Sequence, residues 1–491
     1  MINKTIYIFL IFFFTSCSVF KPDSYMLKSS HSKALEYKNA ITSSFLKKHL
    51  HVLASDEFEG RETTKKGQKL AATYLKNFLN ETNIKSAYDS TYFQQFPVDV
   101  SDFNNVKLFI YNEQLSFIDQ FYSFGNPINK SVTNLDLIDV DYGIVSSSVD
   151  NYEGKDVSGK IALMSQGIKS SKDPISQGNW RTKLKSAEEK GAEAIIIKKE
   201  DFENKDIRIK EYIRNPTMKM HNNRKIKPHI PVFIADNKLF KEDSLYQVSF
   251  STMVTENKTA ENVVSYIPGK TNESIVISAH YDHIGFDRGE VCNGADDDGS
   301  GTVALMNIAK AFQEAYEDGR IPERNIVFLM VSGEEKGLFG SQFYTENPIF
   351  DLDKTMVNLN IDMVGRQDTV QNDNNYIYLI GSDKISKDLH VISEQVNKKH
   401  INFRLDYTYN KEDDPNRFYY RSDHYNFAKN NIPVIFYFGG LHEDYHKPTD
   451  EVDKIDFTKL EKVTQLVFLT AWELAYRKKS IKNSGEGHFS R

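Results

Sequence analysis

The strongest constraint on the fold is an alternation of short apolar segments and amphipathic segments between residues 256 and 476. Short apolar runs are typical of buried strands, and apolar residues at three- and four-residue spacing are typical of helices. Strands are expected over residues 274–279, 325–331, 356–361, 376–380 and 434–438, and helices over residues 300–316, 385–399 and 457–476. This alternation predicts an α/β fold with a mostly parallel central sheet and helices on both faces.

The remaining chain predicts a second, smaller domain. Residues 41–53 and 70–79 have helical periodicity and precede a stretch with a different character. From residue 101 to residue 255, short apolar strands surround one helix-like segment at 182–190, which predicts an inserted α+β or β domain. We therefore expect a main domain formed by residues 39–100 and 256–478, an insertion at 101–255, and a disordered tail at 479–491.

Composition excludes several classes of protein. The chain has 40% hydrophobic and 26% charged residues, which excludes a disordered chain or a polytopic membrane protein. Its 62 Lys and Arg against 68 Asp and Glu give a net charge of −6, so nucleic acid is not an expected partner. The insertion carries a basic run between Lys205 and Lys227. Acidic residues interleave with it, which favours a solvated face over a polyanion-binding or membrane-binding patch.

The amino terminus has the features of a targeting segment. Lys4 precedes an apolar run at 6–14, shorter than the roughly 20 residues that span a bilayer as a helix. Residues 1–16 are therefore expected to be a signal peptide. Phe14-Thr-Ser-Cys17 resembles the lipobox of bacterial lipoproteins, which implies lipidation at Cys17. Because Phe14 stands where leucine is usual, cleavage without lipidation and an uncleaved anchor remain alternatives.

These features predict an exported protein. Lipidation would tether it to a bacterial membrane, in the periplasm or at the cell surface, through a polar segment at 17–38. The only other cysteine is Cys292, so the fold is not expected to rest on disulfides.

Histidine, aspartate or glutamate follows the ends of four predicted strands. The residues are His280 with Asp282, Glu334 with Glu335, Asp362, and His442 with His446. Three further aspartates, Asp296 to Asp298, lie in the loop before the helix at 300–316. Ligands of open α/β sheets bind at the carboxyl ends of the strands, so these side chains are expected to meet in one pocket.

The residue types indicate a metal centre. Imidazole and carboxylate groups without thiolates suit a catalytic divalent ion, with zinc as the expected metal. Two histidines and several carboxylates exceed the three protein ligands of a usual single-ion catalytic site. Two ions, roughly 3.5–4 Å apart, would use them all, and one carboxylate must then bridge the ions.

The motifs resemble those of the zinc exopeptidase family, which includes secreted bacterial leucyl aminopeptidases, aminopeptidase Y and glutamate carboxypeptidase II. The matching segments are His280-x-Asp282, Asn293-Gly-Ala-Asp296-Asp-Asp, Glu334-Glu335, Asn360-Ile-Asp362-Met-Val-Gly-Arg366 and Asp444-Tyr-His446-Lys-Pro-Thr-Asp450. Leu53 to Arg61 resembles the family's amino-terminal segment. The insertion resembles a protease-associated domain more loosely.

The resemblance implies a role for each site residue. One ion would be held by His280, Asp296 and Asp362, and the other by Asp296, Glu335 and His446, with Asp296 as the bridge. Glu334 would be the general base, and Asp282 would orient His280. Tyr445, Asp423 and His424 are candidate pocket residues. His442 is the alternative to His446, and His283 is not expected to be a ligand.

The function that the resemblance implies is that of an exported metallo-aminopeptidase acting on peptides. Glu334 would take a proton from a water activated by two ions and pass it to the leaving amine. A carboxypeptidase or dipeptidase of the same family is an alternative that would need a cationic pocket for the substrate carboxylate. A glutaminyl cyclase would use one ion, and a non-catalytic receptor-like binding module would be expected to have lost ligands or the base.

Overall fold

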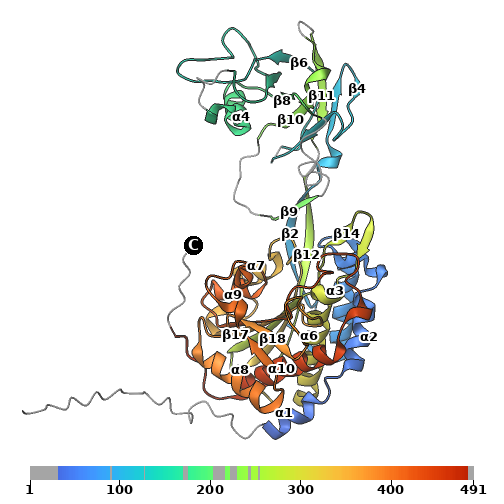
Figure 1. Cartoon of the computed structure of the whole chain (residues 1–491), viewed down its shortest axis with the longest axis vertical. Helices are drawn as coiled ribbons and strands as arrows, with labels where there is room; N and C mark the ends of the chain where they lie inside the picture. Colours follow the sequence, from blue (N-terminus) through green and yellow to red (C-terminus); the bar gives the residue numbers. More distant parts are fainter. Residues whose placement is uncertain are drawn as a thin grey trace, which may run out of the picture. The chain divides into compact units, whose positions relative to one another are not determined.

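The computed structural model describes residues 31–88, 91–125, 128–169, 175–202, 216–221, 229–241, 245–252 and 255–484. These residues form two compact units (Figure 1). The larger unit contains the described residues up to Gln94 and from Asn262 onward, and the smaller one spans Gln95–Glu261. Two strands carry the chain across the boundaries, β2 (Phe93–Ser101) and β12 (Thr255–Ile267), and the boundaries predicted from the sequence fall within the same two strands.

The larger unit is built on one sheet. Its strands are β13 (Ser274–His280), β16 (Asn325–Val331), β17 (Thr355–Asp362), β18 (Tyr376–Ile380), β19 (Arg404–Asp406) and β20 (Val434–Phe438). Together with β12 they run in the order β19-β18-β20-β17-β13-β16-β12. β13 pairs in parallel with β16 and β17, and β17 pairs in parallel with β20. The predicted α/β class with a mostly parallel sheet is confirmed.

Two small pairings flank this sheet. β1 (Lys85–Ser86) pairs with β12, and β14 (Gly285–Asp287) forms an antiparallel ribbon with β15 (Glu290–Cys292). Cys292 is buried and is a free thiol.

Helices cover both faces of the sheet. They are α1 (His31–Lys38), α2 (Ser43–Leu53), α3 (Lys66–Glu81), α6 (Gly301–Glu317), α7 (Phe339–Glu346), α8 (Lys387–His400), α9 (His424–Ala428) and α10 (Phe457–Tyr476). Because successive strand residues point to opposite faces, Ile275 and Ile277 of β13 pack into the core with α6 and α10, whereas Val276 packs into a second core with α7 and α9. A strand buried on both faces explains why its sequence is apolar throughout.

The elements that the sequence predicted in the larger unit lie within two residues of their expected ends, except that helix α3 begins at Lys66, ahead of the expected residue 70. Several other elements, among them α1, α7, α9 and β19, were not predicted. Helix α1 lies in the segment predicted as a tether, where Ala34 and Tyr37 are 2% and 7% exposed in the core of the larger unit. The predicted signal peptide, Cys17 and the tail from residue 485 lie outside the described residues.

The smaller unit has its own sheet and core. Its elements are β3 (Lys107–Ile110), β4 (Glu113–Gln114), β5 (Phe121–Ser123), β6 (Ser131–Asp139), β7 (Ile161–Ser165), α4 (Trp180–Glu189), β8 (Ala194–Lys199), β9 (Thr217–Met220), β10 (Val232–Asp236) and β11 (Gln247–Ser251). The strand order is β4-β3-β11-β6-β7-β8-β10-β5, and β6, β7, β8 and β10 are parallel neighbours. Most of the basic run lies outside the described residues, although Lys219 lies in β9.

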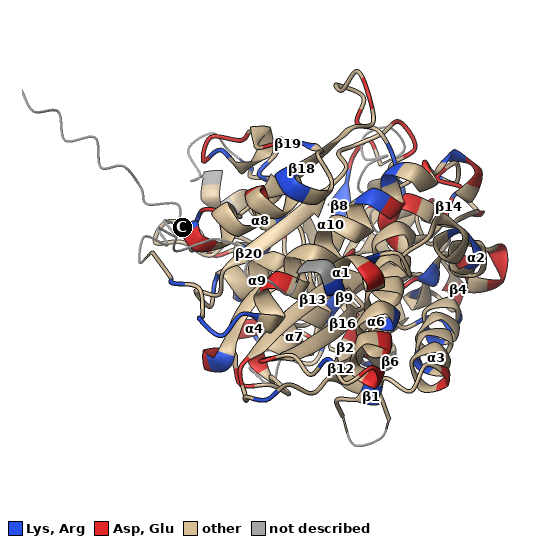
Figure 2. Cartoon of the chain, turned by 90° about the horizontal axis from the view of Figure 1, so that it is seen from below, with Lys and Arg blue, Asp and Glu red and all other residues tan. Residues whose placement is uncertain are grey.

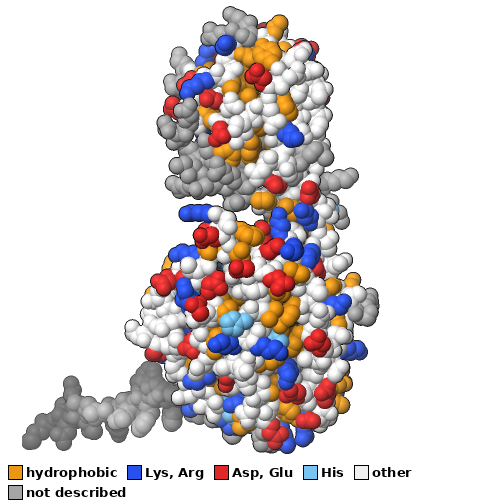
Figure 3. Space-filling model, turned by 90° about the vertical axis from the view of Figure 1, so that its right-hand side faces the viewer, with side chains coloured by type: hydrophobic (Ala, Val, Ile, Leu, Met, Phe, Trp, Pro, Cys, Tyr) orange, Lys and Arg blue, Asp and Glu red, His pale blue; other side chains and the backbone are white. Residues whose placement is uncertain are grey.

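Along the ribbon of the described residues, positions of Lys and Arg are interspersed with positions of Asp and Glu (Figure 2). The space-filling view shows the same mixture of acidic, basic and hydrophobic side chains on the face that it displays (Figure 3). Among the helices formed by described residues, none combines the length and apolar character needed to cross a membrane.

Candidate metal centre

The sheet of the larger unit brings the polar strand ends together. His280 is the last residue of β13 and Asp362 is the last residue of β17, while Glu334 and Glu335 follow β16. β13 lies between β16 and β17, so these three strand ends are neighbours. His446 follows β20, which is the next strand beyond β17.

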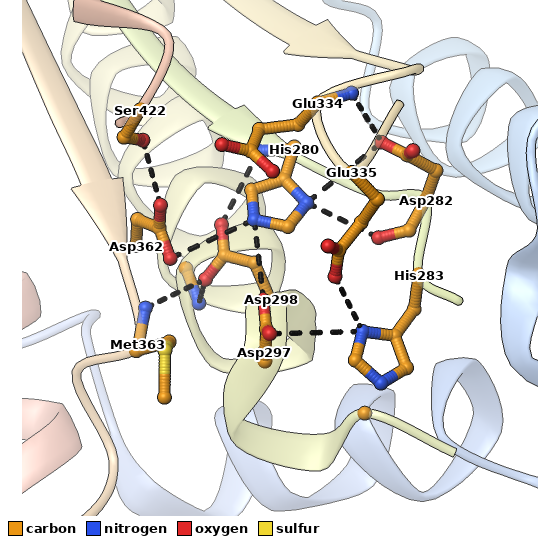
Figure 4. Close-up of polar contacts among 12 residues, drawn as sticks. His280, Asp282, His283, Asp297, Asp298, Glu334, Glu335, Asp362, Met363 and Ser422 are labelled. Carbon is orange, nitrogen blue, oxygen red and sulfur yellow. Dashed lines mark hydrogen bonds and ion pairs between the residues drawn. The ribbon is translucent and has the colours of Figure 1, made fainter. Parts of the chain in front are cut away.

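One group of donors surrounds His280. Its Nε2 atom lies 3.4 Å from Asp297 Oδ1 and 3.6 Å from Asp362 Oδ1, and His280 is 1% exposed (Figure 4). Two donors of one tetrahedral zinc ion, each about 2.0–2.1 Å from it, are about 3.3 Å apart. These three side chains therefore have the separations of ligands to a single ion.

A second group surrounds His446 and shares Asp297. His446 Nε2 lies 3.1 Å from Asp297 Oδ2 and 3.0 Å from Glu335 Oε2. This buried nitrogen has no hydrogen-bond partner among the described residues, although two carboxylate oxygens face it. A nitrogen lone pair and two carboxylate oxygens at this distance have the arrangement of ligands around a cation. Asp297 directs one oxygen to each group, which is the geometry of a bridging carboxylate.

The prediction that Asp296 is the bridge is wrong by one residue. Asp296 Oδ1 accepts a hydrogen bond of 2.6 Å from the Gly365 N–H, and its Oδ2 lies 3.4 Å from His442 Nε2. His442 is therefore placed beside Asp296 and not at Asp297. The turn Ala295–Ser300 has non-helical backbone angles at Asp297 and Asp298, so the three successive aspartates point in different directions.

Asp298 and Asp450 hold this turn in place. Asp298 Oδ1 accepts hydrogen bonds from the N–H groups of Gly301 and Met363, and its Oδ2 accepts one from the N–H of His280. Asp298 thus caps the start of α6 and also ties the turn to β13 and β17. Asp450 Oδ2 accepts hydrogen bonds from the N–H groups of Asp296 and Asp297.

Other contacts orient the donors. His280 Nδ1 lies 3.1 Å from the Asp282 carbonyl oxygen and 3.7 Å from its Oδ1 atom. The Asp282 carboxylate accepts hydrogen bonds from Thr63 Oγ1 and the Glu334 N–H. Asp282 therefore lies beside His280, as expected, but it contacts that ring mainly through its backbone. Asp362 Oδ2 accepts a hydrogen bond of 2.6 Å from Ser422 Oγ, which leaves Oδ1 facing His280.

Glu334 and Glu335 diverge from one strand end. Figure 4 shows the Glu334 carboxyl on the side of Asp362 and the Glu335 carboxyl on the side of His283. Glu334 lines the same cavity as His280, Asp297 and Asp362. Burial raises the pKa of the Glu334 carboxyl well above its usual value; the nearby His280 opposes this rise and Glu335 adds to it.

The charges in this cluster fit divalent cations. No lysine or arginine among the described residues forms an ion pair with Asp297, Glu334, Glu335 or Asp362. Burial by itself would lower the pKa of His446, but Asp297 and Glu335 raise it to about 10. So much buried negative charge is costly unless it is paired or bound to metal, and oxygen and nitrogen donors of this kind suit zinc.

A cavity of about 60 Å³ opens beside the donors. Its other lining residues are Met363, Phe418, Arg421, Phe436, Phe438, Leu441 and Tyr445. Of the three candidate pocket residues, Tyr445 lines this cavity, and its ring stacks on His446 with centroids 3.9 Å apart.

Asp423 and His424 are not among the described residues that line the cavity. Asp423 accepts a hydrogen bond from Ser341 Oγ, and its burial raises its pKa to about 7. The His424 ring stacks on Phe436, with ring centroids 4.7 Å apart. The two residues therefore stand behind the cavity wall.

The sequence missed two residues of the cluster. The sequence could not distinguish Asp297 from its two neighbours, because nothing in a run of three aspartates marks the one that faces the other donors. His283 is fully buried, with Nδ1 2.9 Å from Glu335 Oε1. Its position directly after Asp282 was the available signal.

An α/β sheet that collects these histidines and carboxylates at its carboxyl edge defines a class of proteins with a candidate two-ion metal centre. Comparison with known proteins points to a family. Residues 262–471 match the model of peptidase family M28. This match supports the zinc exopeptidase family that the motifs predicted.

Relatives match over parts of their length. Aminopeptidase YwaD of Bacillus subtilis (strain 168) is 24% identical over 349 residues, which cover 67% of this chain and 65% of that protein. Leucine aminopeptidase 1 of Fusarium vanettenii is 38% identical over 105 residues, 21% of this chain and 26% of that protein. The chain thus spans less than two thirds of the length of either relative.

Solved structures share the fold. An aminopeptidase from Aneurinibacillus sp. strain AM-1 aligns with a TM-score of 0.51 at 18% identity, over 91% of this chain and 97% of that one. The zinc aminopeptidase BSAP of Bacillus subtilis aligns with a TM-score of 0.51 at 20% identity, over 90% of this chain and 97% of that one. At this identity the likeness establishes the fold.

Proposed function

We propose that this chain is a two-metal aminopeptidase that removes single residues from the amino termini of peptides. The observation that carries the proposal is the position of Asp297, whose two oxygens face His280 and His446 separately. His280, Asp297 and Asp362 would hold one ion, and Asp297, Glu335 and His446 the other. Zinc is the proposed metal, because the donors are imidazole and carboxylate and because BSAP is called a zinc aminopeptidase.

Two such ions, when bound, would supply Lewis acidity that lowers the pKa of water and polarises a carbonyl. Glu334 would take a proton from the attacking water and deliver it to the amine of the leaving peptide. Its buried position beside the donors, with a raised pKa, supports this proton-carrying role. The apolar wall formed by Phe418, Phe436 and Phe438 would receive an apolar side chain of the substrate.

The names of the relatives support action at the amino end of the substrate. One observation favours a second candidate, a carboxypeptidase or dipeptidase of the same family. Arg421 lines the cavity, and its guanidinium lies 4.9 Å from the centre of the Phe418 ring. An exposed arginine there offers a cation for a substrate carboxylate, which that alternative requires.

A substrate panel separates these activities. Aminoacyl-anilides, peptides blocked at the amino end and peptides blocked at the carboxyl end are incubated with the protein, with and without chelator. Cleavage that tolerates a carboxyl-terminal block but not an amino-terminal block is expected. The reverse pattern would assign the carboxypeptidase activity instead, and cyclisation of amino-terminal glutamine with one ion per chain would assign a glutaminyl cyclase. Binding of two ions without turnover of any substrate would support a non-catalytic binding module.

We also propose that the protein is exported and anchored by lipid at Cys17, where it would meet peptides outside the cytoplasm. The support is the sequence of residues 1–17 alone. Labelled fatty acid fed to expressing bacteria should be incorporated into the wild-type chain and not into Cys17→Ala, and only the wild type should sediment with membranes. Equal sedimentation of the two without label incorporation would contradict lipidation.

A further inference from the structure

His283 is a buried histidine next to the donors that the proposed mechanism does not use. Its side chain is 0% exposed, and its Nδ1 atom lies 2.9 Å from Glu335 Oε1 and 3.8 Å from Asp297 Oδ2. Figure 4 shows the ring beyond Glu335, on the side of that carboxylate away from His280. The ring centroids of His283 and His446 are 5.7 Å apart.

The two oxygens of Glu335 have different partners. Oε2 lies 3.0 Å from His446 Nε2, at the separation of two ligands of one ion, whereas Oε1 lies at hydrogen-bond distance from His283. An ionised carboxylate only accepts hydrogen bonds, so His283 Nδ1 must carry the hydrogen that it shares with Oε1. That hydrogen bond occupies Oε1 and leaves Oε2 for the ion.

We infer that His283 is a positioning residue for the second ion, holding Glu335 so that it binds through Oε2 alone. The inference rests on the proposed two-ion function. The 3.8 Å separation from Asp297 Oδ2 favours this indirect role over direct ligation by Nδ1, because the proposed donor pairs of this group lie 3.0–3.1 Å apart.

The surroundings of His283 fix the ring. Gly294 has a positive φ of 54°, and a Cβ atom there would lie 2.5 Å from His283 Cγ, so the glycine gives the ring its room. The backbone N–H of His283 donates to the Arg61 carbonyl oxygen at 3.3 Å. The buried Arg61 guanidinium in turn donates to the carbonyl oxygens of Asn293 and Gly294, so that Arg61 joins the backbone of His283 to the loop that contains Gly294. A histidine held this firmly can impose its direction on Glu335.

Three variants test the inference by metal affinity. His283→Leu and His283→Ala remove the donor, and His283→Asn keeps an N–H donor near the position of Nδ1. Metal-free proteins are titrated with Zn²⁺ in competition with a chromophoric chelator, which gives a dissociation constant for each ion. His446→Ala and His280→Ala identify which constant belongs to which group.

The expected effect is limited to one of the two ions. His283→Leu and His283→Ala should weaken the constant assigned to the His446 group by about 10–100-fold, the usual effect of losing a residue that orients a ligand, and leave the other constant unchanged. His283→Asn should recover most of the loss. A matched control is His49→Leu: this buried histidine of α2 is hydrogen-bonded through Nδ1 to Tyr74 Oη, outside the cluster, and its variant should leave both constants unchanged.

Three outcomes would overturn the inference. These are unchanged constants in both donor-free variants, equal weakening of both ions, and a His283→Asn variant as weak as His283→Leu, which would indicate direct ligation. Circular dichroism of the metal-free proteins identifies a variant that fails to fold, and the remaining donor-free variant then decides. A wild-type chain that takes up fewer than two ions would refute the proposed two-ion function itself, whereas a two-ion wild type with unaltered variants refutes only the role of His283.

Discussion

Both units of this protein contain neighbouring parallel strands, but among the described residues only the larger unit gathers buried metal-ligating side chains where those strands end. In the larger unit, β13, β16 and β17 deliver His280, Glu334 and Asp362 to a buried cluster. In the smaller unit, β6 ends in Asp139, which pairs with Lys198 at 2.7 Å near the surface. Among the described residues of that unit, no group of three histidine, cysteine, aspartate or glutamate donors lies close enough to hold an ion.

The difference shows what a parallel sheet does and does not supply. Strand direction brings side chains to one edge in both units. A metal centre also requires that these side chains be buried and left without lysine or arginine partners, which holds for Asp297 and Asp362 but not for Asp139. The functional distinction between the units therefore rests on which charges have partners, and the following predictions test it.

Metal removal should have the largest effect, and the loss of stability should be confined to the larger unit. Treatment with a chelator is expected to abolish hydrolysis, and added Zn²⁺ should restore it. Losing ions supplied at about 1,000 times their dissociation constant should also lower the free energy of unfolding by about 4 kcal/mol per site. Hydrogen exchange followed by mass spectrometry should place the lost protection at β13, β16 and β17. An equal loss of protection in β7 and β8 would contradict the assignment of metal binding to the larger unit.

The second largest effect is expected from a comparison of substitutions at two neighbouring aspartates. Asp297→Asn removes a charge shared by both donor groups and is expected to lower ion binding at both and to reduce turnover by several orders of magnitude. Asp296→Asn keeps an oxygen for the Gly365 N–H and should still bind two ions. Metal content by mass spectrometry and kcat for both variants provide the comparison. If Asp296→Asn loses the ions and Asp297→Asn keeps them, the bridge has been assigned to the wrong residue.

Glu334→Gln should separate chemistry from metal binding. The side chain keeps its size but cannot accept the proton, so kcat is expected to fall about 10²–10⁴-fold. The variant should retain both ions, because Glu334 belongs to neither donor group. Metal content and steady-state kinetics are measured on the same preparation. Turnover near that of the wild type would exclude Glu334 as the base.

Substitution of Lys183 in the smaller unit should have the smallest effect. It should change the free energy of unfolding and leave turnover unchanged. Lys183 is 1% exposed and donates to the Ser165 carbonyl oxygen, and burial lowers its pKa to about 8. The unfolded lysine keeps its proton up to about pH 10.4, so the cost of burying the charge is present below pH 8 and disappears as the pH rises from 8 to about 10.4.

The measurement is urea unfolding of the wild type and Lys183→Met between pH 7.5 and pH 10. The wild type should gain stability relative to the variant as pH rises, with a slope of at most about 1.4 kcal/mol per pH unit. Turnover at pH 7.5 should be the same in both. A pH-independent difference would show that burial does not lower the pKa of this amine, which would then keep its proton over the same pH range as in the unfolded chain.

The accuracy with which the sequence predicted the helices and strands differs from element to element. The strands at 325–331, 376–380 and 434–438 and the helix at 457–476 were placed at their observed ends, because long apolar or amphipathic runs mark them clearly. Helix α1 was read as a tether, since its two buried apolar residues, Ala34 and Tyr37, stand among polar ones. Only their contacts with the core of the larger unit reveal the helix.

The amino-acid sequence by itself determined the kind of centre: histidines and carboxylates follow parallel strands, and parallel strands end on one side of a sheet. The tertiary structure decided which of three adjacent aspartates is shared, and that His283 contacts Glu335. The physical reason is that residue type and strand order fix where a side chain begins. Its direction depends on the local backbone angles, as at Asp297, and on hydrogen bonds from residues far away in the chain.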